Sequence, residues 1–305
     1  TYQNITLHVE LPICAGEQDY IVMTVLNTKA YGWLSTTLGS NTTYEELAKA
    51  VFNAEGADFW GTYPTDKTPE LMPISNWKTM TIKSANTHPD NCYHLTMPVY
   101  RTVAKAQLYM NTSSDLVDVT VKDARIVSSN AFVNGVVFTG NTKVVTGSNG
   151  ENSMQGNCDM DVAVPQQLDP LLLRKAAVEK PLWNTSTNKW APVTVNDVAV
   201  SGDVNDPYTW VGSTFLYEND EALIETSYDS KPESNGGYYM QITYDMTVSD
   251  NTESNIVKYV PLPAIVRNHD YTVKATVEQA VNGRLVINYI VTLWENTTID
   301  VPPFN

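Results

Sequence analysis

The last part of the chain contains two alternating runs joined by a turn signal, and this pattern limits the possible folds most. In the first run, Tyr271, Val273, Ala275 and Val277 alternate with polar residues, as in a half-buried β-strand. Asn282-Gly283 then favours a tight hairpin turn. The return run has an apolar row of Leu285, Ile287, Tyr289, Val291 and Leu293. A slip of one residue would move that whole row to the opposite face, so the register of the hairpin is strongly specified.

Composition extends this prediction to the whole chain. Thr, Val, Asn and Tyr are abundant and helical periods are rare, which predicts an all-β protein. A chain of 305 residues favours two domains. The polar, glycine-rich stretch 146–161 has no periodicity and is the predicted boundary. We therefore expect two antiparallel β-sandwiches, an N-terminal domain over 1–152 and a C-terminal domain over 153–305.

Individual elements follow from local patterns. Within the strand expected over 116–127, the apolar phase changes between Val121 and Ala124, which predicts a β-bulge. One or two short helices are expected, the first after the capping box Thr43–Glu46 with helical spacing as far as Val51. The second is expected over 171–178, after Asp169-Pro170. Further strands are expected at 5–11, 19–26, 77–82, 101–110, 183–202, 213–217, 221–228 and 237–248. The strand at 19–26 has a nearly continuous apolar run, which favours a central position, whereas Pro261 and Pro263 suggest a sheet edge.

The sequence contains no motif that indicates catalysis. The P-loop, the Gly-x-Ser-x-Gly elbow and the HExxH pattern are all missing. Cys92-x-His94 resembles half of a zinc site, but no second pair stands at zinc spacing. His269 is expected in an exposed turn. We therefore predict a protein that is not an enzyme, with no catalytic, cofactor-binding or metal-ligating residues and no cofactor.

Charge and cysteine content exclude further classes. With 19 basic and 34 acidic residues the net charge is −15, so no basic surface is available for nucleic acid. The three cysteines, Cys14, Cys92 and Cys158, are an odd number and exclude a fully paired disulfide framework within one chain. They are expected to be small buried hydrophobic residues.

Four segments, in order, carry a resemblance to a known family. They are Leu71-Met72-Pro73-Ile74, Arg101-Thr102-Val103-Ala104-Lys105, Thr214-Phe215-Leu216-Tyr217-Glu218-Asn219, and the run from Arg267 to Tyr271 together with the Pro-x-Phe-Asn end. The chain resembles the fimbrillins, the type V pilins of Bacteroidales. Within these motifs, Arg101, Lys105, Glu218, Asn219, Arg267 and Asn268 are expected to fix the fold by hydrogen-bonding loops to sheet edges.

The resemblance implies a fold and a processing history. Both sandwiches would have the transthyretin-like Greek-key topology. The chain would be exported as a lipidated precursor, which would be its only association with a membrane. A protease would then cut after Arg or Lys, leaving Thr1 as the first residue and removing the first strand of the N-terminal domain. An open apolar groove would remain in that domain.

The resemblance also implies a function. The chain would be a structural pilin subunit that polymerises by donor-strand exchange into a cell-surface fimbria, anchored to the outer membrane and serving adhesion and biofilm formation. Its partners would be identical subunits, tip and anchor subunits, and a host glycan or protein. The donor would be the segment 285–305: the row Leu285, Ile287, Tyr289, Val291 and Leu293, and the later cluster Ile299, Val301 and Phe304.

Three alternatives stay open at this point. Residues 285–294 could be only an internal hairpin strand, with 299–305 as its tail. The chain could be a fimbrial tip or surface adhesin, although its apolar, strand-like end favours a stalk subunit. It could also be a secreted β-sandwich hydrolase with two carboxylates across a cleft.

Overall fold

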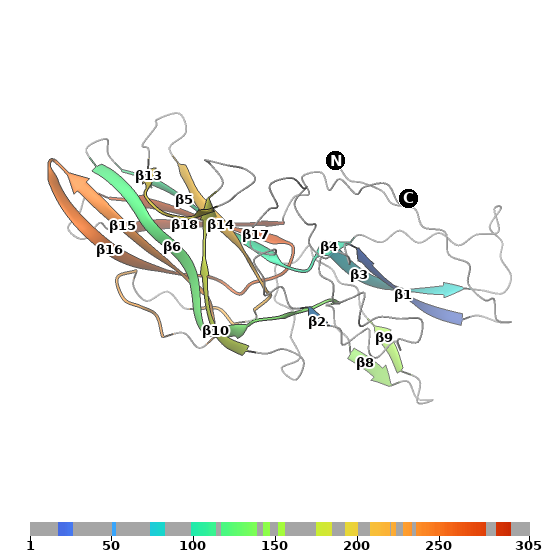
Figure 1. Ribbon diagram of the computed structural model, residues 1–305. Helices are drawn as coiled ribbons and strands as arrows, with labels where there is room; N and C mark the ends of the chain where they lie inside the picture. The colour runs from blue at the N-terminus through green and yellow to red at the C-terminus, as the bar shows by residue number, and fades with distance from the viewer. Residues whose placement is uncertain are drawn as a thin grey trace, which may run out of the picture.

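The computed structural model is built of strands, and it contains no helix in the part that it describes (Figure 1). The residues described are 18–26, 51–52, 74–82, 99–113, 117–138, 143–146, 152–155, 175–184, 193–200, 208–219, 221–223, 228–233, 236–278 and 285–293. Over these ranges no helix is long and apolar enough to cross a membrane. The prediction of an all-β protein is confirmed.

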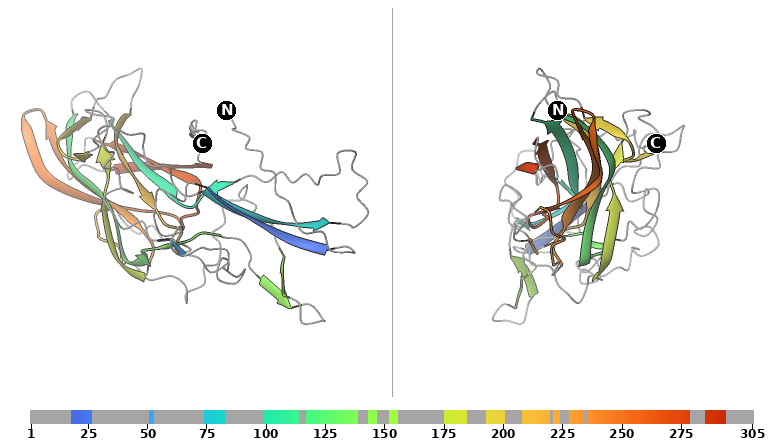
Figure 2. Two further views of the ribbon diagram at one scale, coloured as in Figure 1. Left: turned by 45° about the vertical axis from the view of Figure 1, so that its right-hand side comes forward. Right: turned by 90° about the vertical axis from the view of Figure 1, so that its left-hand side faces the viewer.

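Two large sheets form a sandwich. One has the order β12-β11-β14-β5-β17-β18, and the other has the order β10-β6-β15-β16 with β13 paired to β6. The strands of the first are β5 (Ala104–Thr112), β11 (Trp183–Asn184), β12 (Val193–Thr194), β14 (Thr209–Leu216), β17 (His269–Val277) and β18 (Leu285–Leu293). The strands of the second are β6 (Val117–Phe132), β10 (Lys175–Pro181), β13 (Val198–Val200), β15 (Tyr239–Val248) and β16 (Asn251–Pro261). Figure 2 shows the two layers from two further sides.

Alternating apolar residues from both sheets meet in one core. Leu108 and Met110 of β5 and Val273 of β17 are fully buried there with Ile126 of β6 and Ile242 of β15. Each of these strands has buried side chains at every second position along most of its length. This is the packing of a β-sandwich, in which the inner faces of two sheets bury each other.

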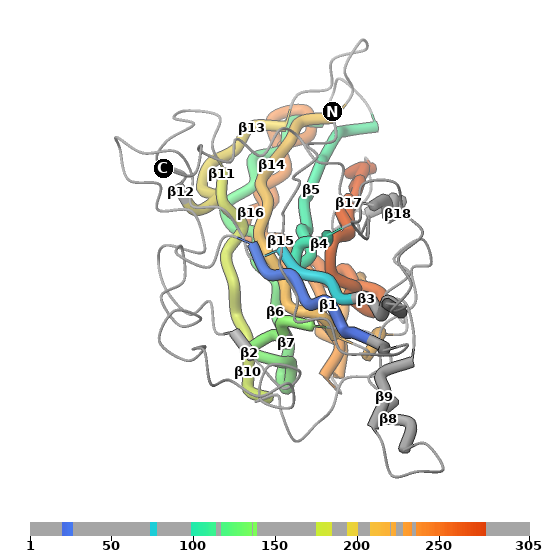
Figure 3. Tube along the Cα trace, turned by 90° about the vertical axis from the view of Figure 1, so that its right-hand side faces the viewer, coloured from blue at the N-terminus to red at the C-terminus, as the bar shows by residue number. Residues whose placement is uncertain are grey.

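Three smaller sheets complete the described structure. β1 (Gln18–Leu26), β3 (Ile74–Ile82) and β4 (Tyr100–Arg101) form a three-stranded sheet in that order. It lies beside the sandwich in Figure 1 and in front of it in Figure 3, which is turned by 90°. β2 (Val51–Phe52) pairs with β7 (Gly135–Val136), and β8 (Lys143–Thr146) pairs with β9 (Asn152–Gln155).

The predicted β-bulge in β6 is confirmed. Thr243 of β15 pairs with Asp123, and the next residue, Tyr244, pairs with Val121, so Lys122 is the additional residue. The bulge reverses the side-chain phase, and both Val121 and Ala124 therefore reach the core. The edge predicted from Pro261 is also confirmed for the described strands, among which β16 lies at the end of its sheet.

Several local predictions are wrong. Residues 175–178 belong to strand β10, in which Val178 is buried against the core, and Val51 belongs to strand β2. Pairing with β6 outweighs the helical pattern of 171–178, because tertiary packing overrides weak propensity. The described parts of 221–228 are not strand, and β1 lies at the end of its described sheet. The strand expected at 5–11 and the rest of both predicted helices lie outside the described residues.

Strands from both sides of the predicted boundary at 152/153 share the two large sheets. β5 pairs with β14 and β17, and β6 pairs with β10, β13 and β15. The pairing of β5 with β17 is parallel, and its register, for example Lys105↔Asp270, joins segments that are more than 150 residues apart in the chain. The described pairing therefore does not separate the strands into two groups at that position.

Candidate assembly site

The first predicted donor row lies in β18, at the end of the six-stranded sheet. β18 pairs with β17 along its full length, from Val277↔Leu285 to His269↔Leu293. Each of the five row residues therefore pairs with a β17 residue whose side chain is buried, namely Val277, Ala275, Val273, Tyr271 and His269. The hairpin predicted from Asn282-Gly283 thus has the expected strand partners. The second cluster, Ile299, Val301 and Phe304, lies outside the described residues, as does Thr1.

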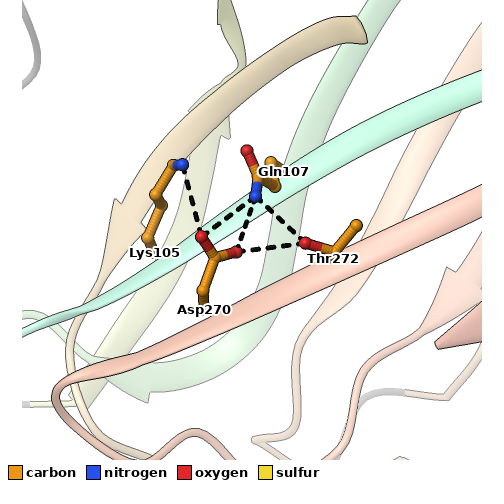
Figure 4. A network of polar contacts seen from close by, with 4 residues as sticks. All are labelled: Lys105, Gln107, Asp270 and Thr272. Atoms are coloured by element: carbon orange, nitrogen blue, oxygen red, sulfur yellow. Dashed lines mark hydrogen bonds and ion pairs between the residues drawn. The ribbon is translucent and has the colours of Figure 1, made fainter. Parts of the chain in front are cut away.

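A polar network joins β17 to β5 on the face of the sheet opposite the core (Figure 4). Asp270 accepts hydrogen bonds from the Gln107 amide at 2.8 and 2.9 Å, and Lys105 Nζ lies 3.3 Å from its carboxylate. The Gln107 amide also donates to the Thr272 hydroxyl at 3.0 Å. Lys105 is one of the residues that carry the family resemblance, and its contact here holds two strands in register.

The resemblance motifs around Glu218 and Arg267 meet in a buried ion pair. The Arg267 guanidinium places Nη2 at 2.7 Å and Nε at 2.9 Å from Glu218 Oε2, while the backbone N–H of Arg267 lies 3.3 Å from Oε1. The two side chains are only 2% and 6% exposed. Arg267 Nη1 also donates to the Val137 carbonyl at 2.9 Å. Because several donors are satisfied together, burial of the two charges is compensated by hydrogen bonds.

Neighbouring motif residues extend this buried group. Asn219 and Ile265 exchange backbone hydrogen bonds of 2.8 and 2.7 Å, and the Asn219 amide donates to the Gly236 carbonyl at 2.7 Å. Asn268, at φ 56°, adopts the left-handed conformation that Asn tolerates. These contacts join loops to strand ends, as predicted for the motif residues.

Asn268 also reaches the segment around β4. Its backbone N–H donates to the Val103 carbonyl at 2.8 Å, and its side-chain oxygen accepts from the backbone N–H of Arg101 at 3.3 Å. Burial lowers the pKa of the Arg101 guanidinium to about 10. The Val137 carbonyl, which binds Arg267, also accepts a hydrogen bond from the hydroxyl of Ser75 in β3. The buried polar group therefore lies where the three-stranded sheet meets the sandwich, and we call its residues Arg101, Val137, Glu218, Arg267 and Asn268 the junction.

The prediction that His269 is an exposed turn residue is wrong. Its side chain is 3% exposed, and Nδ1 lies 2.8 Å from the Arg267 carbonyl. The polar sequence around it indicated a turn, but His269 is the first residue of β17 and directly follows Asn268 of the junction. The four polar residues from Arg267 to Asp270, before the alternating run, were the only local signal, and they do not distinguish a buried from an exposed histidine.

β1 forms an edge in the N-terminal part of the chain. It pairs antiparallel with β3 over its whole length, from Gln18↔Ile82 to Leu26↔Ile74, and it lies at the end of the described sheet. Every side chain from Tyr20 to Leu26 is half-buried, so neither face of this largely apolar strand is fully covered. An edge strand of this kind offers a row of backbone donors and acceptors to an added strand.

The described residues contain no group of three or more His, Cys, Asp or Glu side chains that could hold a metal ion. Cys92 and His94, the half-site considered above, lie outside these residues, as do Cys14 and Cys158. The carboxylates of the junction and of the polar network are each engaged by a cation or an amide. Their arrangement fixes strands and loops.

Comparison with known proteins gives matches among solved structures. No family model matches the chain, and no curated protein matches it. A crystal structure of a "putative cell adhesion protein" from Parabacteroides distasonis is similar at 11% identity and a TM-score of 0.47, covering 94% of this chain and 78% of that one. Another "putative cell adhesion protein", from Bacteroides eggerthii, is similar at 14% identity and a TM-score of 0.45, covering 90% and 78%. A fimbrial protein from Bacteroides vulgatus is similar at 10% identity and a TM-score of 0.39, covering 80% and 67%. These solved structures are described as a fimbrial protein and "putative cell adhesion" proteins of Bacteroides and Parabacteroides.

Proposed function

We propose that the chain is a structural pilin subunit that polymerises by donor-strand exchange into a fimbria at the bacterial cell surface, anchored to the outer membrane. The C-terminal segment 285–305 of one subunit would add to β1 in the N-terminal part of the next. The observation that carries this proposal is that, among the described strands, β18 lies at the end of the six-stranded sheet and β1 lies at the end of the three-stranded sheet. Strand addition joins two such edges through backbone hydrogen bonds.

The length of the two edges supports this pairing. β1 and β18 have nine residues each. A donor row of five to eight apolar side chains contributes on the order of 10–20 kcal/mol when buried. Ordering a free segment costs about 1–2 kcal/mol per residue. For β18 both terms are largely met already in the monomer, where it pairs with β17, so they nearly cancel when the strand changes partners.

The last seven residues contribute differently. Pro302 and Pro303 have no backbone N–H and cannot donate to a ladder. Ile299 and Val301 would therefore pair as the final part of the donor, and Phe304 would insert as an apolar anchor beyond the last hydrogen bond. These assignments rest on the alternation of apolar residues and on the resemblance of the chain end to the pilin family.

Truncation of the chain after Trp294 tests which part of the segment acts as the donor. After N-terminal processing, the full chain is expected to form ladders that resist sodium dodecyl sulfate, and the truncated chain is expected to fold but stay monomeric. Ladders from the truncated chain would remove Ile299, Val301 and Phe304 from the donor. Absence of ladders from the processed full chain would contradict the pilin function.

A further inference from the structure

β17 is attached to the sandwich by contacts that do not involve β18. On one side it pairs with β5 from Asp270↔Lys105 to Val277↔Thr112, and the polar network of Gln107 and Asp270 reinforces that pairing. At its start, Asn268 bonds to the Val103 carbonyl. Arg267, one residue earlier, is held by Glu218 and by the Val137 carbonyl. Removal of β18 would leave all of these contacts in place.

The junction also reaches the sheet that holds β1. Val137 accepts hydrogen bonds from both Arg267 and Ser75, and Ser75 belongs to β3, the direct partner of β1. A second connection runs from Asn268 to Arg101 in β4, which also pairs with β3. The buried ion pair therefore lies between β17, which pairs with β18, and the three-stranded sheet, in which β1 is the last of the described strands.

We propose that Arg267 and Glu218 are positioning residues that hold β17 and the three-stranded sheet in place while β18 leaves. This rests on the proposed exchange, because it describes how one subunit can release a strand without unfolding. The hydrogen bonds of this pair have preferred angles and so fix the position of Arg267 relative to Glu218, whereas apolar contacts are non-directional. The junction thus makes β18 a separately opening unit, and the rest of the sandwich stays folded.

Native-state hydrogen exchange of the full chain measures this directly. The readout is the ratio of exchange rates of two peptides, one covering 285–293 and one covering 269–278. In the wild-type chain the 285–293 peptide is expected to exchange at least about 10-fold faster, as for a unit that opens by itself. A ratio near one would mean that β17 and β18 open together, and it would overturn the proposal.

Substitution of the pair then tests the two residues. The double variant Glu218→Leu/Arg267→Met replaces the ion pair with apolar side chains of similar length, a change that is often neutral or stabilising for a buried pair. The ratio is expected to fall towards one in this variant, while far-ultraviolet circular dichroism stays strand-like. The control Glu179→Gln removes an exposed partner of Arg125 in the other sheet and should leave the ratio unchanged. A folded double variant that keeps the wild-type ratio would overturn the assignment.

A milder variant covers the case in which the double variant does not fold. Asn268→Gly keeps the left-handed backbone but removes the side-chain oxygen that binds the Arg101 amide. It should lower the ratio about threefold, by loss of one hydrogen bond, and an unchanged ratio would contradict the proposal. If the wild-type chain forms ladders that resist sodium dodecyl sulfate but its exchange-rate ratio is one, the positioning role is wrong and the pilin function stands. If the exchange-rate ratio is high but the processed chain forms no ladders, the pilin function is wrong and the separate opening of β18 stands.

Discussion

At the scale of single residues, the buried ion pair of the junction is sensitive to the loss of one partner. Arg267 and Glu218 are almost fully buried, so removal of one charge leaves the other uncompensated in the interior. Glu218→Gln is expected to lower the free energy of unfolding by about 3–5 kcal/mol. Urea unfolding followed by tryptophan fluorescence measures this change. The same substitution at Glu179, which is 59% exposed in its ion pair with Arg125, should cost less than about 1 kcal/mol. Equal effects at both positions would contradict the importance of the buried pair.

Tyr271 gives a residue-scale prediction on pH. Its hydroxyl accepts a hydrogen bond from the Val266 N–H at 2.7 Å and donates to the Ala264 carbonyl at 3.1 Å. Burial raises its pKa to about 12. The unfolded tyrosine ionises near pH 10, so the stability that Tyr271 contributes is complete below about pH 10 and is lost as the pH rises towards 12.

The variant Tyr271→Phe isolates this contribution. At pH 8 it should be about 1–3 kcal/mol less stable than the wild type, because Val266 and Ala264 lose a hydrogen-bond partner. The difference should shrink between pH 10 and pH 12, since only the wild type has this ionisable group. Urea midpoints measured for both chains across this range decide the question. A stability difference between wild type and variant that grows with pH would contradict a raised pKa of Tyr271 in the folded state.

At the scale of elements, the β15–β16 hairpin has a two-residue turn that the sequence does not optimise. Ser249 and Asp250 have φ values of 47° and 69°, and the ladder closes at Val248↔Asn251. Two positive φ values are those of a type I′ turn, in which glycine is preferred at the second position. Asp250→Gly is therefore expected to raise the free energy of unfolding by about 0.5 kcal/mol. The control is Ser230→Gly, in an exposed segment without a positive φ. Urea unfolding of this variant should show no increase in the free energy of unfolding.

At the scale of the whole molecule, each subunit would carry one donor and one acceptor, so two different defects should complement each other. Ile299→Asp/Val301→Asp places charges in the donor, and Val25→Arg places a charge on the half-buried face of β1. Each processed chain alone should stay monomeric. An equimolar mixture should form one-to-one dimers that grow no further, because the first chain accepts and the second donates.

Size-exclusion chromatography with light scattering distinguishes these outcomes. Polymers from either variant alone would mean that the substituted residues are not part of the exchange. If the mixture of the two variants contains only monomers while the wild-type chain forms ladders, β1 and the C-terminal segment do not pair with each other.

The alternation of the chain determined much of the local structure. Period-two patterns correctly predicted most of β5, β6, β15 and β17, and the phase change between Val121 and Ala124 placed the bulge at Lys122. Asn282-Gly283 correctly indicated that β17 pairs with β18. These features depend on residues that are close together in the chain, because side-chain direction and turn geometry are local properties.

The tertiary structure alone decided which distant segments meet. The parallel pairing of β5 with β17 joins strands from both sides of the predicted boundary, and no local pattern specifies a partner that far away. Residues 175–178 form a strand because they pair with β6, and this pairing stabilises the strand more than their weak helical pattern favours a helix. Arg101, Glu218, Asn219, Arg267 and Asn268 were visible in the sequence only as separate motifs. Their convergence, and the burial of His269 beside them, follow from sheet order, because a buried charge is stable only where the fold brings its partner to it.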